Sequence, residues 1–227
     1  MLSDKRIVIV CGHYGCGKTN FSLNLALEYA KKGEKVTLVD LDLVNPYFRS
    51  SDKEYRGIMD EYSIRVIAPT YAGTTVDIPT LPPEIYSIFE KDSGRIVIDV
   101  GGDSVGSTVL GRFYEKLKDE DYEMLYVINR FRTLVSTAQE AYELLDEIQV
   151  VSRLRATGFV NNSHLMDSTS LETLKQGIEY AEQFRELSGL DYKCNTIPRQ
   201  LMDSALTDDK SIKNLFPIEI LVKKPWE

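Results

Sequence analysis

The residues with the clearest chemistry form a glycine-rich segment near the start of the chain. Positions 12–19 have the spacing Gly-x-x-x-x-Gly-Lys-Thr and lie between an apolar run and a helical pattern. Glycines allow the backbone N–H groups of such a loop to converge on a phosphate at a helix N-terminus. The segment is a P-loop, or Walker A motif, in which Lys18 is expected to reach the β- and γ-phosphates as a catalytic residue and Thr19 to ligate Mg²⁺. The predicted nucleotide-binding residues of this loop are Gly12, His13, Tyr14, Gly15, Cys16, Gly17, Lys18 and Thr19.

Two carboxylates follow the second apolar run of the chain, residues 35–41. Strand alternation would place Asp40 and Asp42 on the same side. Burying two like charges is costly unless a cation or hydrogen-bond donors meet them. We predict that Asp42 ligates Mg²⁺ and acts on an attacking water. Asp40 is either part of the same metal site or a structural carboxylate, and the sequence favours neither role.

A third carboxylate ends the apolar run 95–100. An apolar strand that ends in aspartate is the Walker B pattern, so Asp99 is expected to hold Mg²⁺ through a water. Gly101 and Gly102 follow it, and they would let the backbone approach the γ-phosphate and move when that group leaves. Gly102 is therefore a predicted nucleotide contact, and Asp103 is a further candidate acid.

The composition limits the classes of partner. Lys and Arg number 27 against 35 Asp and Glu, which gives a net charge of −8 and argues against non-specific binding to nucleic acid or an anionic membrane. No apolar stretch approaches the length of a membrane span, and no signal-peptide pattern is found. The cysteines Cys11, Cys16 and Cys194 are odd in number and lack Cys-x-x-Cys spacing, which favours a reducing cytoplasm over a disulfide scaffold.

Short apolar runs alternate with helical patterns along the chain. Several runs are continuously apolar, as in parallel strands that are covered on both faces. We therefore predict an α/β fold with a mostly parallel, doubly wound sheet of about seven strands flanked by helices, and residues 1–227 as a single nucleotide-binding domain. The predicted strands are 6–11, 35–41, 65–68, 95–100, 123–128, 156–160 and 192–197. The clearest predicted helices are 20–32, 133–149 and 170–187.

Two stretches do not follow this alternation. Residues 70–83 contain one glycine and three prolines without a clear period, and they follow a strand, so they are either a functional loop at the ligand-binding edge or a packed surface loop. The tail 218–227 is not a convincing amphipathic helix, and we expect an edge segment or a loose end there.

Together these motifs resemble the deviant-Walker-A branch of P-loop NTPases, which contains MinD, ParA and the nitrogenase iron protein. The resemblance runs from about residue 6 to 201. It implies that Asp42 orients the attacking water and that Asn20 lies near the α-phosphate. It also implies that Asn162 contacts adenine and that Pro198 packs on the base, with Gln200 in the same segment. The sequence Asn161-Asn162-Ser163-His164 lacks the acidic residue that reads guanine, which favours ATP over GTP.

The chain departs from that branch at its signature lysine, whose place is taken by His13. That lysine reaches across a nucleotide-sandwiched dimer to the partner's phosphates, so a nucleotide-dependent homodimer and fast hydrolysis are both put in question. Arg49, in the predicted first switch loop, is either a phosphate or partner contact or a solvated side chain, and Arg130 and Arg132 leave the same alternatives open.

The resulting functional hypothesis is an ATP-binding protein and Mg²⁺-dependent ATPase that acts as a nucleotide switch. ATP and Mg²⁺ would order the segments 42–50 and 101–107, and an unknown protein partner would read their release on hydrolysis. One alternative is an ATP-dependent small-molecule kinase or ligase, in which the loop 70–83 lines the acceptor pocket. Another is a non-hydrolysing ATP-binding regulator, suggested by His13. The acceptor contacts of the first alternative would be Tyr71, Thr74, Thr75 or Asp77.

Overall fold

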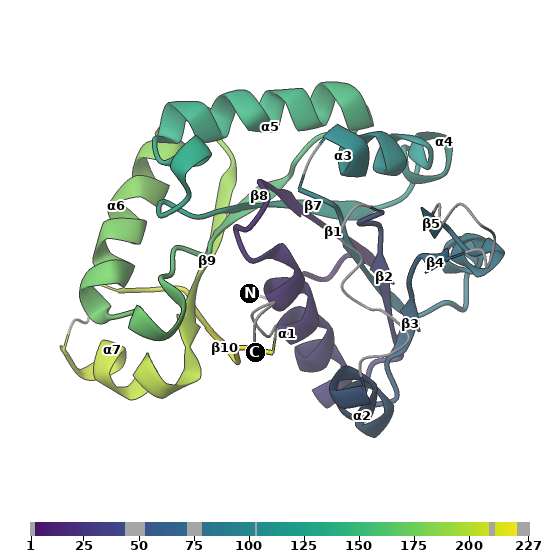
Figure 1. Ribbon diagram of the computed structural model, residues 1–227, viewed down its shortest axis with the longest axis horizontal. Coiled ribbons are helices and arrows are strands. Elements are labelled where there is room, and N and C mark those ends of the chain that lie inside the picture. The colour runs from purple at the N-terminus through teal and green to yellow at the C-terminus, as the bar shows by residue number, and fades with distance from the viewer. Residues whose placement is uncertain (1–2, 44–52, 72–78, 103, 209–211, 222–227) are drawn as a thin grey trace.

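The computed structural model describes residues 3–43, 53–71, 79–102, 104–208 and 212–221. Within these ranges, eight strands form one parallel sheet in the order β10-β9-β8-β7-β1-β6-β2-β3, with helices on both faces (Figure 1). The strands of the sheet are β1 (Ile7–Gly12), β2 (Val36–Asp40), β3 (Arg65–Ile67), β6 (Arg95–Asp99), β7 (Tyr122–Ile128), β8 (Gly158–Asn161), β9 (Asp191–Pro198) and β10 (Leu215–Ile218). The predicted α/β class with a doubly wound parallel sheet is confirmed.

Helices connect these strands, and short turns complete the described chain. The α-helices are α1 (Lys18–Lys31), α2 (Lys53–Glu61), α3 (Ser104–Gly111), α4 (Tyr114–Leu117), α5 (Ala138–Ser152), α6 (Leu171–Ser188) and α7 (Met202–Asp208). The 3₁₀ turns are η1 (Pro83–Phe89), η2 (Thr133–Val135), η3 (Met166–Ser168) and η4 (Arg199–Leu201). A separate antiparallel ribbon pairs β4 (Thr70–Tyr71) with β5 (Pro79–Thr80).

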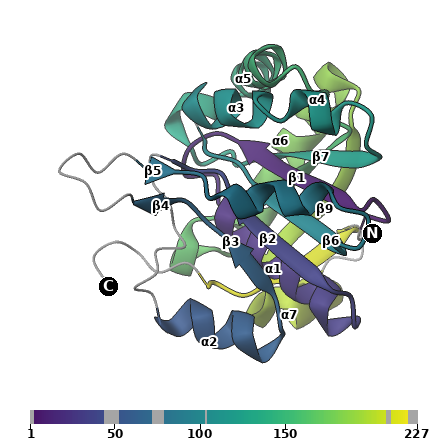
Figure 2. The same cartoon turned by 90° about the vertical axis from the view of Figure 1, so that its right-hand side faces the viewer.

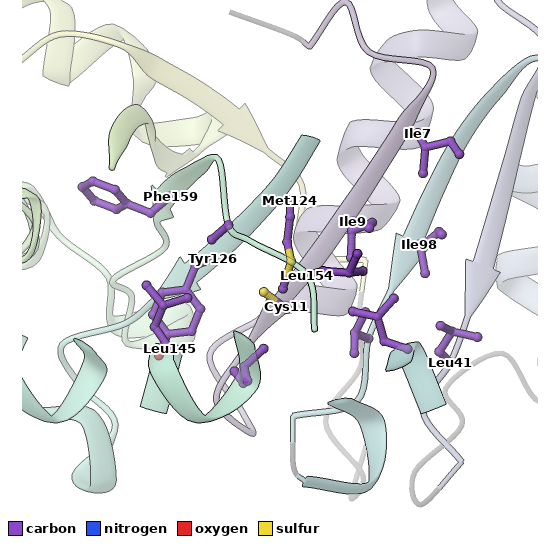
Figure 3. Close-up of a cluster of buried hydrophobic side chains, with 14 of the residues drawn as sticks. Ile7, Ile9, Cys11, Leu41, Ile98, Met124, Tyr126, Leu145, Leu154 and Phe159 are labelled. Carbon is purple, nitrogen blue, oxygen red and sulfur yellow. The ribbon is translucent and has the colours of Figure 1, made fainter. Parts of the chain in front are cut away.

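The sheet separates two apolar cores. α1 and α2 cover one face, and α3 to α6 cover the other (Figure 2). On β1 alternate residues enter opposite cores, since Ile7 and Ile9 face α3 to α6 whereas Val8 and Val10 face α1. Figure 3 shows the first of these cores, in which Ile9 lies among side chains of the neighbouring strands. A strand that is buried on both faces has no need of alternating polarity, which explains the continuous apolar run at the start of the chain.

The sheet has one strand more than the seven expected. The additional strand is β10, which pairs with β9 from Leu215 to Ile218. It is only four residues long and contains Pro217, which has no N–H to donate and is tolerated at the edge of a sheet. Such a short segment has no clear pattern in the sequence. The expected edge segment at 218–227 therefore begins earlier, and residues 222–227 lie outside the described part.

Helix termini agree with the sequence signals in two cases and differ in a third. α1 is followed by Gly33 at φ 83°, and α6 ends at Gly189 in a left-handed conformation. The helix expected at 133–149 instead starts at 138. Thr137 and Glu140 form a capping box there, which ends the preceding η2 turn and begins α5.

Two predicted loops are partly ordered as regular structure. The segment expected to switch at 101–107 passes into α3 at residue 104, where Gly106 packs so closely on Gly101 that a Cβ would lie 2.4 Å from its carbonyl oxygen. The ends of the irregular stretch 70–83 pair as β4 and β5, and the prolines at its end start η1. Residues 44–52 and 72–78, which include Arg49, Thr74, Thr75 and Asp77, lie outside the described residues, as does Asp103.

Candidate functional site: the loop between β1 and α1

The glycine-rich loop joins the central strand to the first helix at the carboxyl edge of the sheet. Its glycines Gly15 and Gly17 have φ values of 73° and 87°, in the left-handed region. Gly17 is the N-cap of α1 and supplies no side-chain hydrogen bond, so the first N–H groups of this helix lack a side-chain cap from that position. A Cβ at Gly17 would lie 2.3 Å from Nδ2 of Asn162. The loop therefore needs glycine at position 17 for both its conformation and its packing. The uncapped N-terminus of α1 is suited to bind an anion.

Lys18 is the first residue of α1, and its side chain is buried. Its ammonium group donates to the carbonyl oxygen of His13 across 3.1 Å, which folds the side chain back over the loop. A Cβ at Gly102 would lie 2.7 Å from the same ammonium group and 2.5 Å from the backbone nitrogen of Tyr14. The tip of β6 thus packs directly on the loop and its lysine. This places a cation above the loop, where a bound phosphate would need one.

Asp99 at the end of β6 faces two hydroxyl groups of α1. Thr19 Oγ1 donates to its Oδ2 at 2.7 Å, and Ser22 Oγ donates to its Oδ1 at 3.1 Å. The carboxyl group is 2% exposed, and this burial raises its pKa from 3.8 to about 6, against the charge of Lys18 and the two hydroxyls. A buried carboxylate with a raised pKa is stabilised by a cation, and oxygen ligands suit Mg²⁺. The residues present therefore fit a magnesium ion held with a nucleotide.

The two aspartates after β2 have different environments. β2 ends at Asp40, so the alternation expected to align it with Asp42 does not extend that far. The Asp40 carboxylate is 1% exposed and accepts from the backbone N–H of Asp42 at 2.8 Å, which makes it part of the turn. Asp42 is partly exposed, and its Cγ lies 3.3 Å from the position of a Cβ on Gly101. Of the pair, Asp42 is the more exposed carboxylate, and it lies beside Gly101 after the end of β6.

Asn162 follows β8 and links three segments. Its Nδ2 donates to the Cys16 carbonyl oxygen at 2.7 Å, and its Oδ1 accepts from the hydroxyl of Thr196 on β9. The residue is 1% exposed. Both ends of the amide therefore support the loop, and base reading by Asn162 stays a prediction that would use its remaining N–H.

The other predicted base and phosphate contacts lie at the ends of β9 and α1. Pro198 ends β9 and is buried, whereas Gln200 lies exposed in η4. The Asn20 amide is bonded to the C-terminal segment: its Nδ2 donates to the Glu219 carbonyl at 3.0 Å, and its Oδ1 accepts from the Leu221 N–H at 2.8 Å. A phosphate contact by the Asn20 side chain stays a prediction, and these bonds direct its amide to that segment.

His13 and Tyr14 form the outer part of the loop. The Nδ1–H of His13 donates to the Tyr14 carbonyl oxygen at 2.7 Å, and the Tyr14 side chain is 61% exposed. Neither side chain is buried against the phosphate-binding face. The nucleotide contacts expected of His13 and Tyr14 stay a prediction.

The chain that carries this site is similar to one known protein family. Residues 7–199 match the CobQ/CobB/MinD/ParA nucleotide binding domain. The chain belongs to this family. The match extends from β1 to the start of η4 and includes Lys18, Asp99 and Asn162, while β10 lies beyond it. The resemblance inferred from the motifs is confirmed. No curated protein gives a significant match.

Solved structures with the same fold include signal recognition particle receptors. Chloroplast FtsY from Physcomitrella patens is 17% identical to this chain, with a TM-score of 0.55. The aligned region covers 86% of this chain and 60% of the FtsY chain. FtsY from Thermotoga maritima is 20% identical with a TM-score of 0.52, with 86% and 62% covered. FtsY from Elizabethkingia anophelis in complex with GDP is 19% identical with a TM-score of 0.50, with 87% and 58% covered. This chain spans about three fifths of the length of these proteins, and the likeness is one of fold.

Two further residues lie at this family's nucleotide loop: His164 was assigned no role from the sequence, and Arg132 was left open as a phosphate or partner contact or a solvated side chain. His164 lies after β8, where its Nδ1 accepts from the Met166 N–H at 3.2 Å and its Nε2 lies 3.1 Å from a Cβ position on Gly17. Burial and the nearby charge of Arg132 lower the pKa of His164 to about 4, so it is neutral at pH 7. Arg132 lies against Gly15. Both residues follow strands at the carboxyl edge of the sheet, and this position was the only sign in the sequence that they could lie near the loop. Their contact with the loop depends on how the strands pack in three dimensions.

The thiols of this family member are not chemically activated. Cys11, Cys16 and Cys194 are free and buried, and burial raises the pKa of Cys11 and Cys194 to about 12 and that of Cys16 above its ordinary value. Cys16 can therefore contribute to the loop through its backbone. None of the described helices has the length and apolar character required to cross a bilayer.

Proposed function

We propose that this chain binds Mg²⁺ and ATP at the loop between β1 and α1 and hydrolyses the nucleotide slowly, as a switch read by a protein partner. The observation that carries the proposal is the cluster of Lys18, Thr19 and Asp99 around one helix N-terminus. Lys18 is held over the loop by His13, and the Thr19 hydroxyl lies 2.7 Å from Asp99. This combines an anion cradle, a cation and a site for a metal in one place.

The residues divide the work by their chemistry. The loop amides and Lys18 would hold the terminal phosphates, and Thr19 with Asp99 would hold Mg²⁺, which neutralises phosphate charge when bound. Asp42 would join the metal site or position the attacking water, because it is the more exposed carboxylate beside Gly101. Gly102 contacts the loop and Lys18, so a change at the γ-phosphate would be felt at the start of α3.

The choice of ATP rests on the segment after β8. It supplies the Asn162 amide, whose remaining N–H would donate to an acceptor of adenine, and it has no acidic side chain before His164 that would read guanine. Asn162, Pro198 and Gln200 are the proposed base contacts. The alternative, a kinase or ligase, would need the loop 70–83 to line an acceptor pocket, and residues 72–78 of that loop lie outside the described ranges. We further propose that residues 1–227 act as a single nucleotide-binding domain in the cytoplasm, where buried thiols stay reduced.

The experiment compares nucleotide binding by wild type and Lys18→Ala using titration calorimetry with Mg-ATP and Mg-GTP. We expect Mg-ATP to bind and Lys18→Ala to weaken it at least about tenfold, because a charge-assisted hydrogen bond contributes roughly 1.5–3 kcal/mol. Lys31→Ala, an exposed lysine of the same helix, is the matched control. No binding by wild type, or equal binding by Lys18→Ala, would overturn the proposal, and preference for Mg-GTP would overturn the choice of base.

Hydrolysis is tested separately with Asp42→Ala. We expect wild type to convert ATP to ADP over a long incubation, and the variant to keep ATP bound without turnover. Unchanged turnover in Asp42→Ala would remove Asp42 from the mechanism. Binding without any ADP from wild type would favour the non-hydrolysing regulator.

A further inference from the structure

Two buried hydrogen-bond donors in the turn after β7 have no acceptor among the described residues. They are Nδ2 of Asn129 and Nε of Arg132. Asn129 is 0% exposed, so water does not reach its amide from the surface. Leaving a buried donor unpaired costs roughly 1–3 kcal/mol, and native proteins rarely do so without a ligand or another functional reason. The two donors belong to side chains of the same turn, three residues apart in the sequence.

The turn itself is held in place by its own hydrogen bonds. Asn129 Oδ1 accepts from the N–H of Phe131 at 3.0 Å, and the Asn129 carbonyl accepts from the N–H of Arg132 at 3.2 Å. The N–H of Arg130 donates to Ser163 Oγ after β8 at 3.1 Å, which ties the turn to the next strand. The position of Arg132 is thus set by the backbone of the turn, and its guanidinium is presented by a rigid support.

That guanidinium lies on the nucleotide loop. A Cβ at Gly15 would lie 3.5 Å from both Cζ and Nε of Arg132 and 3.7 Å from its Nη1, which is ordinary contact distance. Gly15 is the middle glycine of the loop whose amides surround a phosphate. The unpaired Nε–H is therefore next to the phosphate-binding backbone.

The charge of Arg132 also has no counter-ion in the described part of the chain. No ion pair joins it to a carboxylate there. Its positive charge adds to the effect of burial in lowering the pKa of His164, and it opposes the rise that burial causes in the pKa of the Cys16 thiol. A partly buried guanidinium without a counter-ion favours an anion, and its planar fork matches phosphate oxygens.

We propose that Arg132 binds the terminal phosphates of the nucleotide from within the same chain, with Asn129 as the residue that positions the turn. The inference rests on the proposed function and adds a phosphate contact to it. Arg132 would give this chain a second cation for those phosphates beside Lys18, without a second subunit. The terminal phosphates are chosen because Arg132 lies against Gly15 of the loop, and the Lys18 ammonium is held to the same loop by the His13 carbonyl oxygen.

The test compares Arg132→Ala with Arg130→Ala, an exposed arginine of the same turn. Titration calorimetry with Mg-ATP, Mg-ADP and AMP measures how the loss depends on the phosphates. We expect Arg132→Ala to weaken Mg-ATP by about tenfold to a hundredfold, to weaken Mg-ADP less and to leave AMP unchanged. Arg132→Lys should fall between, because it keeps the charge and loses the fork. Arg130→Ala should bind all three as wild type does.

The melting temperature without nucleotide distinguishes this role from a structural one. Removing an unpaired cation should leave it unchanged or raise it, whereas a fall of several degrees in Arg132→Ala would show a structural contact and overturn the inference. Wild-type affinity for Mg-ATP in Arg132→Ala, alongside lost affinity in Lys18→Ala, would overturn the inference and leave the proposed function standing. No binding by wild type would overturn both.

Discussion

The hydroxyl of Thr19 donates to the buried carboxylate of Asp99 across 2.7 Å, although 80 positions separate the two residues. Parallel pairing of β1 with β6 brings them together, because the carboxyl ends of both strands meet at one edge of the sheet. The bond keeps a hydroxyl and a carboxylate side by side before any ligand arrives. A metal ion would meet oxygens that are already positioned.

This relationship predicts the effect of Thr19→Val. The variant removes a donor to Asp99, so the free energy of unfolding should fall by roughly 1–3 kcal/mol. Nucleotide binding should lose its dependence on Mg²⁺ while binding in EDTA is kept. Thr19→Ser retains the hydroxyl and serves as the control. Calorimetric titrations with and without Mg²⁺ make the comparison, and equal Mg²⁺ dependence in Thr19→Val would contradict it.

The pKa values of Asp99 and His164 predict opposite dependences on pH. The Asp99 pKa is raised to about 6, so its stabilising protonation is complete below about pH 4 and is lost as the pH rises through 6. The His164 pKa is lowered to about 4, so its contribution is present above pH 6.5 and is lost as the pH falls. Each shift corresponds to about 3 kcal/mol across its range, so the two largely cancel in wild type.

The two pH-dependent contributions can be separated by measuring the free energy of unfolding of Asp99→Asn and His164→Asn. The measurements are made in EDTA between pH 4 and 7.5. Relative to wild type, Asp99→Asn should become less stable as the pH falls, and His164→Asn should become more stable. Parallel profiles for the two variants would show that the pKa shifts do not govern stability. Mg²⁺-dependent nucleotide binding by wild type should weaken as the pH falls through about 6, since Asp99 becomes protonated.

The contact between Gly102 and the loop predicts a large effect of one methyl group. In Gly102→Ala the Cβ would lie 2.5 Å from the Tyr14 nitrogen, which is backbone and cannot move aside cheaply. We expect a loss of about 1–3 kcal/mol of stability and weaker Mg-ATP binding. Gly57→Ala in α2 is the control, because nothing lies within 4 Å of its Cβ position, and it should be neutral or stabilising. Equal thermal melts and affinities for the two variants would refute this prediction.

Two asparagines of α1, Asn20 and Asn24, bond to residues 219–221. These bonds lead to a prediction about the role of Asn20. Asn24 bonds both the N–H and the carbonyl of Glu219, at 2.8 and 2.9 Å, and Asn20 bonds Glu219 and Leu221. We expect Asn20→Ala and Asn24→Ala to speed amide hydrogen exchange at residues 219–221 alike, with unchanged affinity for Mg-ATP. Weaker binding in Asn20→Ala alone would instead support its expected place near the α-phosphate.

Local chemistry in the sequence predicted the core of the candidate site and much of the fold. The spacing of Gly12 to Thr19, and an apolar strand ending in Asp99, are patterns that need only a few consecutive residues. The end of α6 at Gly189 has an equally local cause, because glycine adopts the left-handed conformation that commonly ends a helix. The prediction of seven strands missed β10 for a reason that is also local. This strand is only four residues long and contains Pro217, so it has no periodic pattern in the sequence.

The sequence by itself determined that a phosphate-binding loop opens the first helix of a parallel α/β sheet, because glycine spacing and continuous apolar runs act through adjacent residues. Only the tertiary structure decided that Asp40 is buried in a turn while Asp42 is partly exposed, and that the Asn162 amide donates to the loop. It also brought Arg132 and its unpaired donor onto Gly15. These contacts join loops that follow different strands, and their geometry depends on how the strands align side by side, which no single stretch of residues encodes.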